Sequence, residues 1–244
     1  MSKPFQFKLF TVQQDRCAMK IGTDGVLLGA WTSIDNNPFS VLDIGTGTGV
    51  IALQLAQRSN AKNIEALEID EDAYEQCVEN FENSPWGDRL FCYHAALDEF
   101  TEEFSDDEAE IDDKFDLIVS NPPFYSEDYK TQNEARDIAR FSEAMPFEHL
   151  IDSASKLLAK KGTFATIIPR KEEGNFIQLA SEKGLFPLRI CRVCGNETSE
   201  EVRSLLEFSF SETTPIQEKL VIEISRHQYT EAYKKLVQDF YLKM

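Results

Sequence analysis

The chain has 244 residues, and 43 Asp and Glu against 25 Lys and Arg give it a formal net charge of −18. That length suffices for one α/β domain with a small extension and a substantial core. Neither a run of 18 apolar residues nor an apolar N-terminal signal core occurs, so the composition argues against a membrane span or secretion and favours a cytoplasmic protein.

The N-terminal region predicts a short strand over Phe10-Thr11-Val12 and a helix over residues 24–31. Between them begins the string Asp15-Arg16-Cys17-Ala18-Met19-Lys20-Ile21-Gly22-Thr23-Asp24-Gly25-Val26-Leu27-Leu28-Gly29-Ala30-Trp31. Thr23 and Asp24 fall at the expected start of the helix, where capping by a short polar side chain is the alternative to a role at a binding site.

Residues 41–44 predict a buried strand that runs into a glycine-rich turn, with a helix over 50–59 behind it. The turn reads Asp43-Ile44-Gly45-Thr46-Gly47-Thr48-Gly49. Glycine lets a backbone approach a ligand closely and accepts positive φ without strain. Strand, turn and helix in this order begin a nucleotide-binding βαβ unit.

Two cofactors compete for this turn. The dinucleotide fingerprint Gly-x-Gly-x-x-Gly/Ala is met by Gly47, Gly49 and Ala52. Glu68, in the next predicted strand at 64–69, supplies the acid expected to bind a ribose. By itself the turn therefore leaves a nicotinamide dinucleotide and S-adenosylmethionine (SAM) both open.

An acidic segment follows the predicted strand at 90–95. Ten of the seventeen residues from Asp98 to Lys114 are Asp or Glu, so with its one lysine the segment carries −9 of the chain's −18. A solvated loop or short helix is the expected structure.

The apolar run 115–120 predicts a buried strand that ends in Asn121-Pro122-Pro123-Phe124. The Asn121 side chain and the Pro122 carbonyl each offer an acceptor, and the two prolines make the segment rigid. Such a pair can grip the two N–H donors of a planar exocyclic amine, while Phe124 stacks on the ring that carries the amine. A proline turn that merely closes the strand is the alternative.

Strands and helices alternate through the rest of the chain: strands at 163–168, 185–193, 204–210 and 219–225, and helices at 71–83, 134–141, 147–159, 171–183 and 229–242. Lys160-Lys161-Gly162 predicts the end of the helix at 147–159. The pattern predicts an α/β fold whose sheet is mostly parallel with an antiparallel edge and is covered by helices on both faces. The last helix carries an apolar stripe that indicates core packing, with a partner-binding role as the alternative.

The five cysteines have no framework spacing, which indicates reduced thiols. Cys191 and Cys194 would lie in a strand, where residues three apart face opposite sides. We therefore expect structural cysteines and no metal site.

Together these motifs resemble class I SAM-dependent methyltransferases that modify an amine nitrogen. The resemblance implies a Rossmann-like fold, with SAM held by the glycine turn and by an acid after the second strand, and the target amine held by the Asn-Pro-Pro-aromatic string. The cofactor roles then fall on Thr23, Asp43, Gly45, Gly47, Gly49, Glu68 and Asn121. The catalytic roles fall on Asn121, Pro122 and Phe124, with Pro123, Phe124 and Tyr125 against the target base. After the third strand, Asp98 comes one residue later than the family's acid, so either Asp98 or the backbone would meet the adenine of SAM.

The string from Arg16 to Trp31 is similar to the start of bacterial tRNA adenine-N6 methyltransferases, which modify valine tRNA at the adenine 3′ of the anticodon, position 37. The likeness continues at Asn83-Ser84-Pro85-Trp86, Ser120–Tyr125 and Tyr229–Met244, so it covers nearly the whole chain. It implies methyl transfer to the anticodon loop of tRNA. Residues 1–35 would be an extension over the cofactor site, and 36–244 the methyltransferase domain.

Phosphate attraction usually dominates RNA binding, so an acidic protein needs a local basic surface. The candidate tRNA contacts are Lys8, Arg16 and Lys20, of which Arg16 and Lys20 are the expected substrate-binding residues; Lys130, Arg136 and Arg140 lie beyond the catalytic string. Scattered surface cations are the alternative. Two other functions also stay open: methylation of a protein glutamine or another RNA base, which uses the same turn and string, and a non-catalytic nucleotide-binding module.

Overall fold

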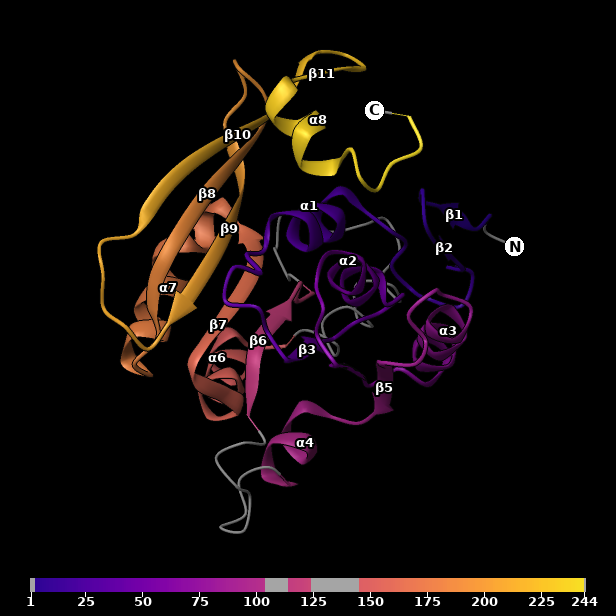
Figure 1. Cartoon of the computed structure of the whole chain (residues 1–244). Coiled ribbons are helices and arrows are strands. Elements are labelled where there is room, and N and C mark those ends of the chain that lie inside the picture. Colours follow the sequence, from indigo (N-terminus) through magenta and orange to yellow (C-terminus); the bar gives the residue numbers. More distant parts are fainter. Residues whose placement is uncertain (1–2, 104–113, 124–144, 244) are drawn as a thin grey trace, which may run out of the picture.

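A computed structural model describes residues 3–103, 114–123 and 145–243 (Figure 1). Nine strands of this described part form one sheet: β3 Ser40–Ile44, β4 Asn63–Glu68, β5 Leu90–His94, β6 Phe115–Ser120, β7 Leu158–Pro169, β8 Phe186–Asn196, β9 Glu201–Ser209, β10 Ile216–Ser225 and β11 Gln228–Tyr229. Their order is β11-β10-β8-β9-β7-β6-β3-β4-β5. A separate pair, β1 Phe5–Gln6 and β2 Thr11–Val12, forms a small antiparallel sheet.

The predicted mostly parallel sheet is confirmed. Strands β5, β4, β3, β6 and β7 all run parallel to one another. The antiparallel pairs lie in the other half, where β9 is inserted between β7 and β8 and β11 pairs with β10. The central strands β3 and β6 are almost wholly buried and apolar, as expected of parallel strands covered on both faces.

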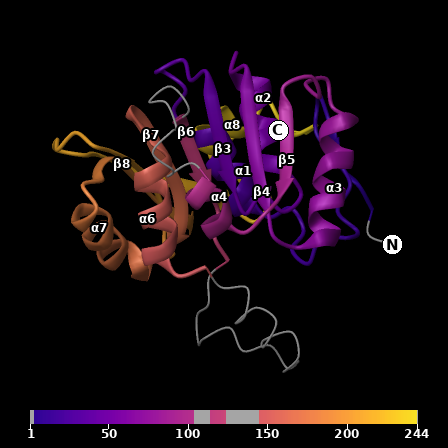
Figure 2. The same ribbon diagram turned by 90° about the horizontal axis from the view of Figure 1, so that it is seen from below.

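Helices cover both faces of this sheet (Figure 2). Their bounds are α1 Thr23–Trp31, α2 Val50–Arg58, α3 Glu71–Glu82, α4 Leu97–Glu103, α6 Phe147–Leu157, α7 Glu173–Glu182 and α8 Glu231–Val237, with a 3-10 turn at Arg170–Glu172. Alternate residues of each strand enter opposite cores. In β3, Val41 joins the core under α1, α2, α3 and α8, whereas Leu42 joins the core under α4, α6 and α7. No described helix is long and apolar enough to cross a membrane.

The helix predicted to end at Lys160-Lys161-Gly162 ends earlier, at Leu157, and that expectation is wrong. Those residues belong to β7, which is irregular where Phe115 pairs with Leu158 but Leu117 pairs with Thr163. A Cβ at Gly162 would lie 2.8 Å from the Phe115 carbonyl oxygen. The glycine is therefore needed for a crowded bulge rather than for a helix terminus.

The helix predicted at 229–242 is also shorter, since α8 ends at Val237. Its apolar stripe nevertheless packs in the core, as predicted, with Tyr233, Val237 and Phe240 buried. The acidic segment begins as the short helix α4, and its residues 104–113 lie outside the described part. The helix expected at 134–141 lies outside it as well.

Candidate active site

Three polar motifs meet where the central parallel strands end. Ile44 of β3 pairs with Leu67 of β4 on one side and with Ser120 of β6 on the other. The residues that follow these strands therefore leave the sheet at one edge, where α/β proteins bind their ligands. Those residues are the glycine turn, Glu68 and Asn121.

The three glycines of the turn all have positive φ, at +69°, +56° and +79° for Gly45, Gly47 and Gly49. A Cβ at Gly45 or Gly47 would meet nothing within 4 Å, so both backbones border open space. A Cβ at Gly49 would instead lie 2.6 Å from the Phe81 ring of α3. Two glycines thus leave room for a ligand, and the third permits close helix packing.

Asp43 lies under this turn with its side chain fully buried. Its Oδ2 accepts hydrogen bonds from the Thr46 hydroxyl at 2.7 Å and from the Ala52 N–H at 3.2 Å. Its Oδ1 is buried and has no hydrogen-bond partner in the described part of the chain. Burial raises the pKa of Asp43 to about 7, and the charge of Glu68 adds to the rise against the two hydrogen bonds.

Glu68 connects the end of β4 to the turn. Its Oε2 accepts from the Gly47 N–H at 2.8 Å, and its Oε1 accepts from the N–H groups of Ile69 and Asp70 at 2.9 and 3.0 Å. The carboxylate is thus held by backbone donors on both oxygens. Glu68 is only half-buried.

Asn121 is half-buried directly after β6, and Pro122 behind it is buried, while Pro123 is half-buried. A Cβ at Gly25 would lie 3.9 Å from Nδ2 of Asn121, so the string abuts the first turn of α1. Phe124 and Tyr125 lie outside the described residues.

The start of α1 differs from the capping interpretation. Gly22 is its N-cap, and no side chain caps the helix. Thr23 is exposed, and Asp24 forms an ion pair at 2.8 Å with Arg203 of β9. These two residues therefore do not cap the helix, and Asp24 fixes it to the sheet instead.

The segment before α1 lies on α3 and reaches the glycine turn. Asn80 of α3 accepts from the Gln13 N–H at 2.7 Å and donates to the carbonyls of Gln13 and Thr48, both at 2.9 Å. Asn80 was not identified from the sequence, although it is a polar residue on the buried face of an amphipathic helix. A buried polar side chain needs hydrogen-bond partners, so this position could have indicated a structural contact.

Arg16, Cys17 and Lys20 belong to the same N-terminal segment. Arg16 forms ion pairs with two acids of α3, Glu75 at 3.2 Å and Glu79 at 3.3 Å, and its side chain is 44% exposed. Burial raises the pKa of Cys17 to about 12, and the nearby charge of Glu68 contributes to the rise. Lys20 is exposed.

Asp98, Cys191 and Cys194 lie on other elements than the glycine turn. Asp98 is exposed on α4 and pairs with His149 of α6. Cys191 and Cys194 are buried free thiols in β8. Within the described residues no three His, Cys, Asp or Glu side chains group as a metal site would require.

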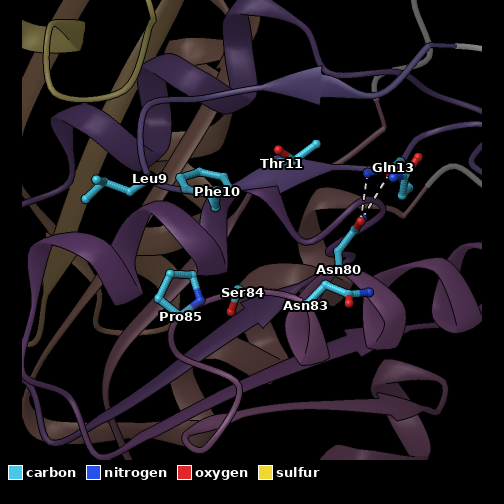
Figure 3. Close-up of a pocket in the computed structure, with 8 residues that line it drawn as sticks. All are labelled: Leu9, Phe10, Thr11, Gln13, Asn80, Asn83, Ser84 and Pro85. Carbon is cyan, nitrogen blue, oxygen red and sulfur yellow. Dashed lines mark hydrogen bonds between the residues drawn. The ribbon is translucent and has the colours of Figure 1, made fainter.

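A cavity of about 590 Å³ lies beside Asn80 (Figure 3). It is lined by Leu9, Phe10, Thr11, Gln13, Asn80, Asn83, Ser84 and Pro85. Several of its polar groups are already used locally, since Asn83 donates to the Glu79 carbonyl and Ser84 to the Phe81 carbonyl. This cavity carries no charged side chain.

Comparison with known proteins shows the family to which the chain belongs. A family model described as "Methyltransferase small domain" matches residues 25–182. The chain is 60% identical over 243 residues to the tRNA1(Val) (adenine(37)-N6)-methyltransferase of Christiangramia forsetii, covering 100% of this chain and 99% of the relative. It is 61% identical over 241 residues to the protein of that name from Flavobacterium johnsoniae, covering 98% and 100%. The chain belongs to the tRNA1(Val) (adenine(37)-N6)-methyltransferase family.

Membership in this family confirms the predicted enzyme class. A predicted O-methyltransferase from Agrobacterium tumefaciens matches the structure with a TM-score of 0.67 over 89% of this chain and 96% of its own, at 18% identity. That likeness shows the Rossmann-like fold. A methyltransferase family implies SAM as the cofactor, which argues against a nicotinamide dinucleotide at the glycine turn.

The residues of the turn fit SAM. Open space borders Gly45 and Gly47, and the unpaired Oδ1 of Asp43 leaves an acceptor at the bottom of the turn. A buried carboxylate oxygen without a partner is unfavourable, so a bound donor or cation would satisfy it.

Proposed function

We propose that this protein transfers a methyl group from SAM to N6 of adenine 37 in valine tRNA, within the cytoplasm. The relatives that share its whole length carry that activity in their names. One structural observation carries the proposal. The Asn-Pro-Pro string and the glycine turn leave neighbouring strands at one sheet edge, because Ile44 pairs with Ser120.

The cofactor end is built from residues of three strands and the N-terminal segment. SAM supplies an electrophilic methyl group on its sulfonium. In our proposal the backbone of Gly45 to Gly49 and the carboxylate of Asp43 hold its methionine end, with Thr23 and Asn121 beside it. Glu68 accepts from the ribose hydroxyls with a carboxylate already oriented by two N–H groups of its own strand end.

Residues 1–35 act, in this proposal, as a cover over the cofactor, and 36–244 form the methyltransferase domain. The hydrogen bonds of Gln13 to Asn80, and of Asn80 to Thr48, support this role because they tie the extension to the glycine turn. Cys17 of the same segment is close enough to Glu68 for that charge to contribute, after burial, to its raised pKa, which also supports a position of the extension beside the cofactor site.

The target end uses acceptors rather than a strong base. Asn121 Oδ1 and the Pro122 carbonyl accept from the two amine N–H groups, which aims the nitrogen lone pair at the methyl carbon. When bound, SAM would supply the methyl group to the nitrogen that these acceptors hold, with its sulfur as the leaving group. The amine proton becomes acidic only when nitrogen gains charge, so it can then leave to water. Phe124 and Tyr125 would stack on the adenine.

The anticodon loop is single-stranded, so its adenine is cheap to turn out of the stack. Lys20 is exposed, whereas Arg16 is already paired with two acids of α3. We propose both as phosphate contacts, with Lys20 the stronger of the two.

The test combines nucleoside mass spectrometry with single-turnover kinetics. Deletion of the gene should remove N6-methyladenosine from valine tRNA, and the parent gene should restore it. Asn121→Ala should lower the methyl-transfer rate about 100- to 1000-fold, the usual effect of losing one positioned contact. Asn83→Ala, an exposed asparagine outside the site, is the control. An unchanged tRNA profile after deletion would refute the function, and a near-parental Asn121→Ala rate would refute the role of the string.

A further inference from the structure

A second cavity, of about 620 Å³, opens between the two ends of the chain. We call it the aromatic groove and define it by Phe5, Tyr229, Tyr233 and Tyr241, with Gly22 and Thr23 at one end. Phe5 belongs to β1, and Tyr241 follows α8. Figure 1 shows that α8 and the segment after it lie above α1 and extend toward β1.

The aromatic groove has a continuous wall of rings. The rings of Tyr229 and Tyr233 lie 5.3 Å apart, and those of Phe5 and Tyr241 lie 6.0 Å apart at 61°. The side chains of Tyr233 and Tyr241 are close enough to influence each other's pKa, which brings the two pairs together. Tyr233 is only 4% exposed, whereas Phe5, Tyr229 and Tyr241 are half-buried and keep part of their ring surface accessible.

This wall is anchored by backbone contacts between the chain ends. Phe7 and Tyr241 form an isolated antiparallel bridge, and the Lys8 N–H donates to the Phe240 carbonyl at 2.8 Å. The rings are therefore held in place before any ligand arrives. Preorganised aromatic faces bind flat partners with little loss of side-chain entropy.

The aromatic groove is continuous with the proposed catalytic site. Gly22 borders it and is the N-cap of α1, and Gly25, in the first turn of that helix, abuts the Asn121 amide. One helical turn rises about 5.4 Å. Stacked bases lie about 3.4 Å apart along a strand. Because Gly22 and Gly25 are three residues apart at the start of one helix, a residue that borders the groove lies within about one helical turn of the residue that abuts Asn121, a separation comparable with one nucleotide step.

The charges of the lining favour a base over a phosphate in the groove itself. Lys243 and Glu223 both line it, so their charges offset one another. Lys20 is exposed next to Ile21, which also lines the groove, and is thus available to a phosphate at the rim. An aromatic interior with a cation at its edge is the arrangement that binds single-stranded nucleic acid.

We propose that the aromatic groove is a subsite for a nucleotide adjacent to the target adenine, whose base stacks on the rings of Tyr229 and Tyr241. This inference rests on the proposed function, since it names how the same RNA substrate is held. Single-stranded loops are bound in this manner, with unstacked bases against aromatic side chains. The subsite would help to hold the loop open while the target base occupies the Asn121 site.

The first test measures steady-state kinetics on a valine tRNA transcript with Tyr229→Leu. Loss of one stacked base should raise the KM for tRNA about 5- to 100-fold, with kcat and SAM affinity within about twofold of the parent. Tyr229→Phe keeps the ring and should behave like the parent. Tyr93→Leu is the matched control, because Tyr93 is 42% exposed on β5 at the far edge of the sheet.

A thermodynamic cycle then identifies the base. An abasic nucleotide on one side of the target adenine should raise the parent KM as much as Tyr229→Leu does, and combining the two changes should add little. If Tyr229→Leu matches Tyr93→Leu, or if the two penalties add fully at both neighbouring positions, the subsite is refuted while the proposed function stands. A parent enzyme that methylates no tRNA would refute the proposed function, and the subsite with it.

Discussion

The buried carboxylate of Asp43 predicts that SAM binding depends on pH below neutrality. In the free protein its pKa is about 7, because burial penalises the charged form. SAM carries a positive amine and a positive sulfonium, so the bound state should favour the ionised acid. At a pH below about 7, Asp43 must therefore lose its proton before or during SAM binding, which weakens the binding.

The size of the effect follows from that pKa. An acid with a pKa near 7 is about half ionised at pH 7 and about 3% ionised at pH 5.5, so the Kd for SAM should rise roughly 15-fold over this interval. Binding at pH 6 should release close to one proton.

The same linkage affects folding. The Asp43 pKa is raised from 3.8, so its contribution to the stability of the free protein is present below about pH 4, is lost as the pH rises through about 7, and should be restored by SAM.

Calorimetry between pH 5.5 and 7, in buffers with different ionisation enthalpies, measures both the Kd and the released protons. Asp43→Asn should flatten the pH profile. Glu65→Gln is the matched control, because Glu65 is also buried with a raised pKa but is hydrogen-bonded to Asn63 of its own strand. A parent Kd that stays constant over this range, or a profile flattened by Glu65→Gln and not by Asp43→Asn, would refute the reasoning.

Three further predictions follow from the site and its surroundings. Glu68→Ala should weaken SAM binding by about 1–3 kcal/mol in calorimetry, since a charge-assisted hydrogen bond is lost; an unchanged Kd would remove Glu68 from the ribose site. Gly49→Ala should lower the free energy of unfolding in urea by about 2–4 kcal/mol, because φ is +79° and the added Cβ would lie 2.6 Å from a phenylalanine ring. Gly174→Ala, in a helix with nothing within 4 Å of the new Cβ, should instead be neutral or stabilise by up to about 1 kcal/mol. Lys20→Gln should reduce the salt slope of tRNA affinity by about one, whereas Lys62→Gln, an exposed lysine before β4, should leave it unchanged; equal slopes in all three proteins would exclude Lys20 from phosphate contact.

Much of the fold could be predicted because its signals are local. The run 115–120 is mostly apolar and is a buried strand, and the glycine turn is followed by a helix as its pattern indicates. Strand alternation with helices also gave the parallel sheet, since a parallel crossover needs a long connection. The catalytic and cofactor roles of the predicted residues stay predictions, although the structure brings the turn, Glu68 and Asn121 to one edge.

Contacts between distant parts of the chain could not be read from local pattern. Gly162 follows two lysines and so resembles a helix end, yet its place in a bulge depends on the carbonyl of Phe115. The position of β9 between β7 and β8 likewise depends on which strands pair, and the hydrophobic pattern of a strand does not specify its neighbours.

The sequence by itself determined the chemistry that we propose for this protein, because a glycine turn and an Asn-Pro-Pro string would act through backbone freedom and acceptors that lie within a few residues. Only the tertiary structure decided what surrounds that chemistry. Asn80 holds the N-terminal segment against Thr48, and Phe5 meets Tyr241 across almost the whole length of the chain. Such contacts arise from how the two cores bury their apolar faces, and burial is a property of the assembled sheet rather than of any one segment.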